Sequence, residues 1–171
     1  MGYDLINRLS KEELVLLCNI YAKNWLAHDG VWFQSIERKY GIDEALEHDE
    51  NAWRSFTKIE ARRIKSFLKL EERPGLNGLK QALQLRLYAT LNQDEILISG
   101  NTLTYRVVSC RVQAARQRKG MAYHPCKSVG IIEYSGFARV IDDRITTEVI
   151  SCHPDVTDES CNCCWKFTLN V

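Results

Sequence analysis

Apolar residues recur at helical spacing through the first 73 residues of the chain. Ser10 and Glu13 have the spacing of a capping box, in which each side chain accepts a hydrogen bond from a backbone amide at the start of a helix. The stripe that follows consists of Leu14, Leu17, Cys18, Tyr21 and Trp25. This i, i+3, i+4, i+7 pattern predicts an amphipathic helix that faces a core.

The pattern is interrupted at His28-Asp29-Gly30, which predicts a break or bend in the helix. Residues 31–36 resume an apolar helical pattern, and Gly41 supplies a stop. His28 and Asp29 lie between Trp25 and Trp32, so they could line a pocket with indole walls. Asp29 could equally be a helix cap that accepts hydrogen bonds from the first amides of the next helix.

A third helix is predicted to begin with Asp43 as its cap. Its other faces carry charged residues, among them Glu60. Its predicted inward positions are Ala45, Ala52, Trp53, Phe56, Ile64 and Phe67. A Pro-Gly pair at positions 74–75 ends this segment, so residues 1–73 are predicted to form a mostly helical half.

Residues 79–171 are predicted to contain a sheet. The segment 85–91 alternates apolar and polar side chains with a period of two, which is typical of a half-buried strand. Residues 92–94 are then expected to form a turn. Strands at 95–99 and 102–109 follow, and the Gly-Asn pair between them predicts an antiparallel hairpin.

The remaining segments complete an α+β prediction. Helices are expected at 111–119 and 126–140, and closing strands at 144–152 and 164–171. The predicted fold has N-terminal helices packed on an antiparallel sheet, with two further helices inserted between strands. Because there is no long linker, residues 1–171 are interpreted as one domain.

Composition narrows the possible partners. Hydrophobic residues make up 45% of the 171 residues and charged residues 26%, which is an ordinary globular mixture. The 23 basic and 22 acidic residues nearly cancel, so no overall field attracts nucleic acid or an anionic membrane. There is no apolar run long enough to span a bilayer and no signal peptide, so we expect a cytoplasmic protein. In a reducing compartment, the seven cysteines are expected to be thiols or metal ligands.

Six of the seven cysteines lie between positions 110 and 164. Cys110, Cys126, Cys152 and Cys164 border predicted helices or strands, whereas Cys161 and Cys163 lie in a polar loop and are left out of the predicted site. Four converging thiolates would form a tetrahedral zinc site, and three with Glu133, His124 or His153 would leave the open position of a catalytic zinc. The alternative is that the cysteines pack as small hydrophobic residues.

Glu133 is the most informative single residue of the predicted helix 126–140. At helical spacing it shares the apolar face with Cys126, Val129 and Gly130. A carboxylate on such a face must be paired, bound to a ligand, or raised in pKa, so Glu133 and Cys126 are the candidate catalytic residues. A structural alternative is that Glu133 caps a nearby helix or pairs with Arg106 or Arg111. Gly130 is expected to let a backbone or ligand approach closely.

A reactive thiol is a second possible chemistry. A thiolate needs a base or a positive neighbour at neutral pH, and Lys127 or a histidine could supply one to Cys126. A basic cluster is also present at Arg111, Arg116, Arg118 and Lys119. This cluster could hold phosphate or an acidic ligand, although such clusters are ordinarily solvated.

Several segments resemble a known superfamily. Residues 126–130, 152–155 and 164–167 are similar to the C-terminal half of the 4-vinyl reductase small-molecule-binding domains and the L-2-amino-thiazoline-4-carboxylate hydrolase-like proteins. Residues 22–30 and 110–116, with the segment at Cys126, more closely resemble an uncharacterised family of bacterial and archaeal cytosolic proteins. The resemblance implies an α+β fold with a ligand cavity between helices and sheet, often in a homodimer. It also implies that Cys126, Cys152 and Cys164, and Cys110 less directly, can bind zinc.

Together these observations predict a cytosolic small-molecule-binding protein with a cysteine-lined site, which could be a metal- or thiol-dependent hydrolase. The alternative is a non-catalytic sensory or scaffolding module whose cysteines are core packing. The candidate residues are Glu133 and Cys126 for catalysis, Cys110, Cys126, Cys152 and Cys164 for metal, and Trp25, His28, Asp29 and Arg111 for the ligand.

Overall fold

The computed structural model of the chain describes residues 3–170. The helical elements are η1 (Ile6–Arg8), α1 (Lys11–Tyr40), α2 (Ile42–Phe67), α3 (Gly75–Leu83), η2 (Ala89–Leu91), α4 (Arg111–Arg118) and α5 (Lys127–Ile141). The strands are β1 (Gln93–Ser99), β2 (Thr102–Ser109), β3 (Ile145–Cys152) and β4 (Cys163–Leu169). The predicted α+β fold is confirmed, and α4 and α5 are the two helices inserted between strands.

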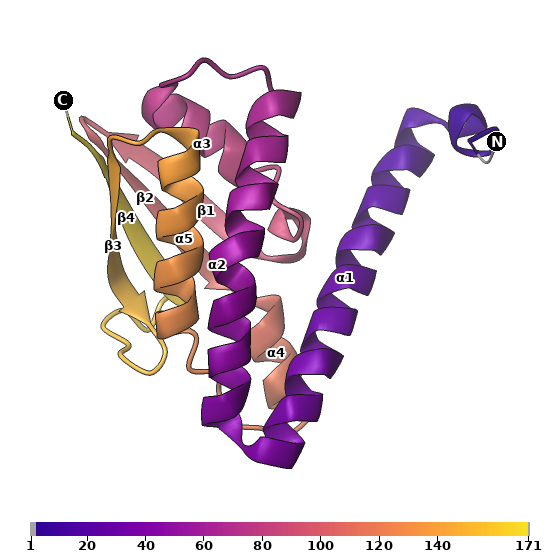
Figure 1. The fold of residues 1–171 in the computed structure, drawn as a ribbon, viewed down its shortest axis with the longest axis vertical. Helices are drawn as coiled ribbons and strands as arrows, with labels where there is room; N and C mark the ends of the chain where they lie inside the picture. The colour runs from indigo at the N-terminus through magenta and orange to yellow at the C-terminus, as the bar shows by residue number, and fades with distance from the viewer. Residues whose placement is uncertain (1–2, 171) are drawn as a thin grey trace.

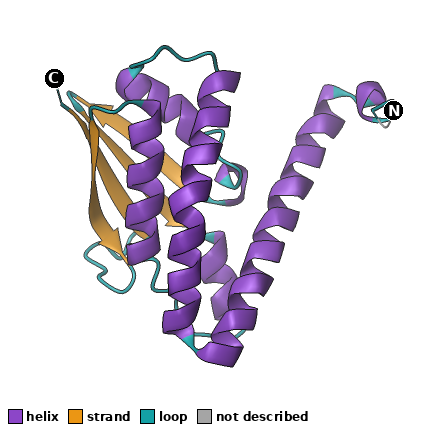
Figure 2. Ribbon diagram, in the orientation of Figure 1, coloured by secondary structure: helices purple, strands orange, loops and turns teal. Residues whose placement is uncertain are grey.

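The strands form an antiparallel sheet in the order β1-β2-β4-β3. One face of the sheet is buried through alternate residues, such as Tyr105 and Val107 on β2 and Trp165 and Phe167 on β4. Helix α5 packs on this face, and α2 packs against α5 (Figure 1). Figure 2 shows the strands on one side of the molecule and the helices on the other. The core therefore lies between the sheet and α5.

Helix α1 is continuous, so the predicted break at His28-Asp29-Gly30 is wrong. Its predicted capping box is confirmed, and Gly41, with φ of +97°, ends it as expected. A single glycine costs only about 1 kcal/mol inside a helix. Aromatic contacts before and after Gly30 stabilise the continuous helix: Trp25 stacks on Phe56, and Phe33 packs against His124.

The N-terminal half of α1 extends away from the rest of the molecule (Figure 1). The predicted core-facing stripe is therefore largely uncovered, with Leu14 37% and Tyr21 56% exposed. Ala22 is the buried residue of this helix. The periodicity therefore predicted the helix correctly. No element among the described residues covers the exposed part of its apolar stripe.

Helix α2 follows α1 directly, and its predicted inward positions Ala45, Trp53 and Ile64 are buried. Four details were predicted wrongly, and the first is Ala52, a predicted inward position that is exposed. Asp43 lies in the first turn rather than at the cap, and Phe67 is 77% exposed near the helix end. Glu60, which was placed on an outer face, is only 7% exposed. Its burial follows from an ion pair described below.

The predicted strand at 85–91 is wrong. This segment forms turns and ends in η2, and its exposure is the reverse of the prediction, with Leu85 45% and Arg86 3% exposed. The Glu60 carboxylate explains the reversal. It accepts hydrogen bonds from the Arg86 guanidinium at 2.9 and 3.1 Å and from the Leu87 backbone N–H at 2.7 Å. These bonds hold the segment against α2 instead of against another strand.

The predicted hairpin between β1 and β2 is confirmed, although β1 begins at Gln93 inside the predicted turn at 92–94. A bulge between Gln93 and Asp94 shifts the register there, and the Asp94 carboxylate accepts a hydrogen bond from the Tyr105 hydroxyl at 3.0 Å. Within residues 3–170, no helix has the length and apolar character needed to cross a membrane.

Candidate functional site

A cavity of about 400 Å³ lies where α1, α2, α4 and α5 meet the buried face of the sheet. Its walls are largely apolar and include several aromatic residues, of which Trp25 and Trp53 come from the two long helices. The other aromatic residues that line it are Phe33, Tyr88, Tyr134 and Trp165. Small-molecule sites in proteins are typically clefts of about 300–1,000 Å³ with apolar walls and a few polar groups. The cavity falls within this class.

Four thiols line the cavity, namely those of Cys110, Cys126, Cys152 and Cys163. They come together because strand ends and helix starts meet at one end of the sheet. Cys110 follows β2 as the N-cap of α4, and Cys126 is the N-cap of α5. Cys152 ends β3 directly opposite Cys163, which begins β4. Three of the four predicted metal-ligand positions are therefore in the cavity.

The Sγ atoms of Cys126 and Cys152 are 3.5 Å apart. Gln113 Nε2 lies 3.7 Å from the Cys126 Sγ and donates a weak hydrogen bond to it. Hydrogen bonding from Cys152, opposed by burial, lowers the pKa of Cys126, and the same contact raises the pKa of Cys152. Burial raises the pKa of Cys110 to about 11. The thiolate of the pair is thus favoured on Cys126.

Cys164 lies on the opposite face of the sheet and does not line the cavity. Successive residues of a strand point to opposite faces, so Cys163 and Cys164 cannot both face the helices. Cys163 was left out of the predicted site, and Cys164 was included. Alternation along the strand could have identified Cys163, because it shares one strand face with the buried residues Trp165 and Phe167.

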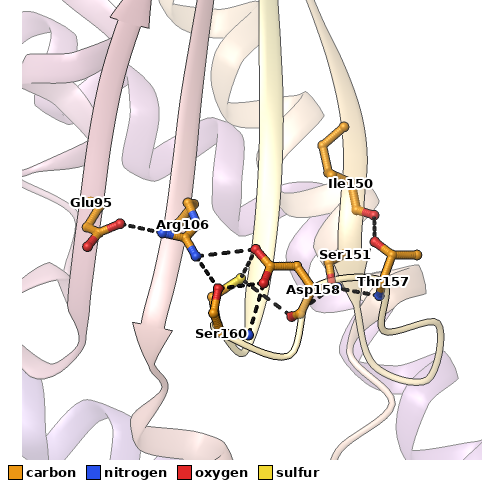
Figure 3. Close-up of polar contacts among 8 residues, drawn as sticks. Glu95, Arg106, Ile150, Ser151, Thr157, Asp158 and Ser160 are labelled. Carbon is orange, nitrogen blue, oxygen red and sulfur yellow. Dashed lines mark hydrogen bonds and ion pairs between the residues drawn. The ribbon is translucent and has the colours of Figure 1, made fainter.

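The outer face of the sheet has its own polar cluster around Arg106 (Figure 3). The Arg106 guanidinium donates to Glu95 at 2.6 Å, to Asp158 at 3.2 Å and to Ser160 at 2.5 Å. Cys161 is 6% exposed, with its Sγ 3.5 Å from an Asp158 carboxylate oxygen. This loop residue is therefore buried, but it is on the face away from the cavity.

The loop before β4 is held by β3 through Ser151 (Figure 3). The Ser151 hydroxyl accepts hydrogen bonds from the backbone N–H groups of Thr157 and Asp158, both at 3.0 Å. The Thr157 hydroxyl donates to the Ile150 carbonyl at 2.6 Å. These contacts fix the course of the chain from β3 into β4, and so the positions of Cys152 and Cys163 at the cavity.

Glu133 is buried and lines the cavity, as the helical spacing predicted. Its partner is Arg86, whose Nη1 donates to it at 2.5 Å, and not Arg106 or Arg111. The Tyr88 hydroxyl donates to the same carboxylate oxygen. Burial raises the pKa of Glu133 to about 6, and Arg86 opposes this shift. Although burial disfavours a charged guanidinium, Glu133 and Glu60 raise the pKa of Arg86, so Arg86 is charged.

Asp29 and Asp49 add two further carboxylates to the cavity wall. Burial raises the pKa of Asp29, and His28 opposes the shift. Burial, followed by the charges of Asp29 and Glu133, raises the pKa of Asp49 to about 7. His124 Nε2 lies 3.8 Å from Asp49, but burial lowers the pKa of His124 to about 4. This contact therefore joins a neutral imidazole to a carboxyl group.

The predicted ligand residues are only partly brought together. Trp25, Asp29 and Arg111 line the cavity, whereas His28 is exposed and does not. Within the predicted basic cluster, Arg116 is 5% exposed and donates to Glu37 at 2.8 and 2.9 Å. The expectation of a solvated basic face is therefore wrong at this position.

Sequence reasoning missed several cavity residues. Asp49 lies four residues from both Ala45 and Trp53, so helical spacing could have identified it. Arg86 and Tyr88 were hidden by the wrong strand assignment. Gly130 packs against the Trp165 ring, where an added Cβ would lie 2.6 Å from Cζ2. The group that approaches Gly130 closely is therefore the Trp165 side chain, and not the backbone or ligand that was predicted.

The described residues do not form a ready metal site. Among residues 3–170, no group of three His, Cys, Asp or Glu side chains is arranged so that it could hold a metal ion. Two sulfurs in contact and two more on the same wall fall short of the closed tetrahedral set of a structural zinc site. Zinc binding therefore stays a prediction.

A comparison with curated proteins finds no match for this chain. The resemblance to vinyl reductases and thiazoline-carboxylate hydrolases receives no support from the comparisons with known proteins. A family profile does match nearly the whole chain, over residues 7–169. The chain belongs to this family, which is described as a family of unknown function, DUF6125.

Proposed function

We propose that this protein binds a small molecule in the cavity between its long helices and the sheet. The observation that carries the proposal is the cavity itself, with a volume of about 400 Å³ and largely apolar walls that include aromatic side chains. A core that only needed to be filled would approach close packing and leave few voids larger than a water molecule. A space of this size with convergent polar groups is typical of a binding site.

The polar groups indicate what the ligand offers. The Trp165 indole N–H is buried and has no hydrogen-bond partner among residues 3–170. This nitrogen has almost no accessible surface, so it is covered by protein and does not indicate what the ligand offers. Asp29 and Asp49 favour a positive charge or N–H donors, because either would offset the desolvation of these carboxyls. The proposed ligand therefore combines an apolar body with a positively charged or N–H donor group.

We propose a hydrolytic activity as the second candidate function of the same site. Cys126 would be its nucleophile, since its thiol lines the cavity and accepts a hydrogen bond from Gln113. Glu133 would have to act as the base while it is bound to Arg86 and Tyr88. Hydrolysis, zinc dependence and a cytoplasmic location remain predictions. So does the expected lack of nucleic-acid and membrane partners.

Ligand binding is tested by screening wild-type protein against a library of small metabolites by thermal shift, followed by calorimetry of each hit. Asp29→Asn is expected to weaken a true cavity ligand about tenfold, which corresponds to about 1.4 kcal/mol. Trp25→Ala should have at least as large an effect, because it removes part of the wall. Trp32→Ala on the same helix provides the control, since Trp32 is 67% exposed and does not line the cavity.

Trp32→Ala is expected to leave the affinity unchanged. Equal losses in all three variants would place the ligand elsewhere on the helix. A screen without hits, together with unchanged stability when the cavity is narrowed by Val112→Phe, would favour the alternative of a non-catalytic module whose cysteines are only core packing.

A further inference from the structure

Cys126 and Cys152 are in direct contact at the cavity wall. Their Sγ atoms are 3.5 Å apart, whereas a disulfide bond is about 2.05 Å long. Closing the remaining distance of roughly 1.5 Å requires side-chain rotation and a small backbone adjustment. Both residues lie where regular structure ends, Cys126 before α5 and Cys152 at the end of β3, so such an adjustment does not break a helix or an interior strand position.

The third thiol in this region is less suited to pair with Cys152. Cys163 lies directly opposite Cys152 in the antiparallel register of β3 and β4. Cβ atoms of such cross-strand pairs are about 4.5–5.5 Å apart, whereas disulfides usually require about 3.5–4.5 Å. Cys163 also interacts with Cys152 by hydrogen bonding. The 3.5 Å contact between the sulfurs of Cys126 and Cys152 therefore identifies Cys126 as the partner.

The two thiols of the pair differ in access and in hydrogen bonding. Cys152 is 1% exposed, whereas Cys126 is partly exposed and begins α5. Gln113 Nε2 donates toward the Cys126 sulfur, and the positive end of a 15-residue helix lies next to it. Both features stabilise a thiolate. Cys126 is therefore expected to be the attacking thiol, and Cys152 the resolving thiol.

We propose that Cys126 and Cys152 are a redox-active dithiol that reduces a small disulfide admitted by the cavity. The Cys126 thiolate attacks one sulfur of the substrate RSSR, which forms a Cys126–SR mixed disulfide and expels RS⁻, which takes up a proton. The Cys152 thiol then loses its proton and attacks the Cys126 sulfur, which forms the Cys126–Cys152 disulfide and expels the second RS⁻. Two protein thiols are oxidised, one disulfide is reduced, and two RSH molecules leave.

This proposal rests on the proposed function in one respect, because the small disulfide must enter the same cavity. The two can fail separately. If the cavity does not admit small molecules, Cys126 will resist alkylation by iodoacetamide as well as oxidation. If the cavity is open but the pair is not redox-active, Cys126 will be alkylated, but no internal disulfide will form.

The test uses full-length protein with Cys18→Ser, because Cys18 is exposed and would react by itself. The probe is hydroxyethyl disulfide, and peptide mapping after alkylation locates each modified cysteine. We expect loss of two thiols, a single cross-link between Cys126 and Cys152, and full recovery with dithiothreitol. In the Cys152→Ser variant the second step is blocked, so one mercaptoethanol group should stay attached to Cys126.

Cys164→Ser is the matched control, since Cys164 is a buried cysteine of the same region that does not line the cavity. It should form the same cross-link as the parent protein. Hydrogen peroxide is a second arm, and it should produce the same disulfide through a sulfenic acid on Cys126 if that thiol is the nucleophile.

Three results would overturn the proposal. One is a Cys152–Cys163 cross-link in place of the Cys126 pair. Another is the absence of a Cys126 adduct in Cys152→Ser protein whose Cys126 is alkylated by iodoacetamide. The third is one tightly bound zinc ion per freshly purified chain that blocks oxidation until it is chelated, because the thiols would then be metal ligands.

Discussion

At the scale of single residues, the site depends on charges that the fold keeps out of water. The Arg86 side chain is 1% exposed, and its positive charge partly offsets the negative charges of Glu60 and Glu133. The helical pattern identified Glu133 as a carboxylate on a buried face, but it could not identify its partner. Arg86 lies 47 residues away in the sequence, inside a segment whose alternation was typical of a strand.

Removing Arg86 should leave two buried carboxylates without their positively charged partner, although each would keep one hydrogen bond, from Leu87 or Tyr88. We expect Arg86→Met to lower the free energy of unfolding by about 3–5 kcal/mol at neutral pH. Adding Glu133→Gln should recover part of the loss, because one of the two charges is gone. Urea unfolding followed by circular dichroism measures both effects. Arg54→Met, which breaks an exposed pair with Glu50, should change stability by less than about 1 kcal/mol. An Arg86 effect as small as the Arg54 effect would contradict this account.

Asp49 makes stability depend on pH. Its pKa is about 7 in the folded protein and near 3.8 when exposed, so the folded state holds the proton more tightly. The contribution of Asp49 to the free energy of unfolding is greatest below about pH 4, and it falls as the pH rises to about 7. Asp49→Asn should therefore raise the free energy of unfolding above pH 7, by on the order of 4 kcal/mol, and should have little effect near pH 4.

The melting temperatures of both proteins from pH 4 to pH 8 would reveal this dependence on Asp49. Glu47→Gln is the control on the same helix, and because Glu47 is exposed its profile should follow that of the wild type. If Asp49→Asn protein were less stable than the wild type at pH 8, the charged form of Asp49 would have a stabilising partner, which would contradict this account.

At the scale of elements, α1 has two unlike halves. Its C-terminal half packs through Trp25 and Phe33 on residues that line or border the cavity. The same face continues toward the N-terminus through Leu14, Val15 and Cys18, which are exposed. The sequence pattern does not distinguish the halves, because a stripe predicts a covered face without specifying what covers it. The predicted homodimer would provide such a cover.

We expect two copies to pair through the N-terminal halves of α1 in antiparallel orientation. This pairing covers Leu14, Val15 and Cys18 and places Lys23 opposite Glu12 in the first turn of the second copy. Light scattering coupled to size exclusion should then give the mass of a dimer for the wild type. Val15→Glu is expected to shift the protein to monomers, because it places a charge in the apolar contact.

Val31→Glu is the matched control for the dimer, since Val31 is 63% exposed on the same helix but lies on another of its faces. It should leave the mass unchanged. A monomeric wild-type protein at high concentration, or equal effects of the two charges, would reject this interface.

At the scale of the whole molecule, the cavity exists only because distant segments meet. Its walls combine Trp25 of α1, Trp53 of α2, Gln113 of α4, Glu133 of α5 and Trp165 of β4. Local patterns predicted most of these helices and strands individually. The space between them depends on how the helices pack on the sheet, and this packing follows from contacts between residues far apart in the sequence.

The sequence by itself determined the α+β class, the long N-terminal helices, the β1–β2 hairpin and the burial of Glu133, because periodicity and capping are local signals. Only the tertiary structure decided the rest. It paired Glu133 with Arg86, replaced Cys164 by Cys163 at the cavity, and brought Cys126 and Cys152 into contact. These choices depend on strand register and on ion pairs between distant segments, whose energies no local pattern contains.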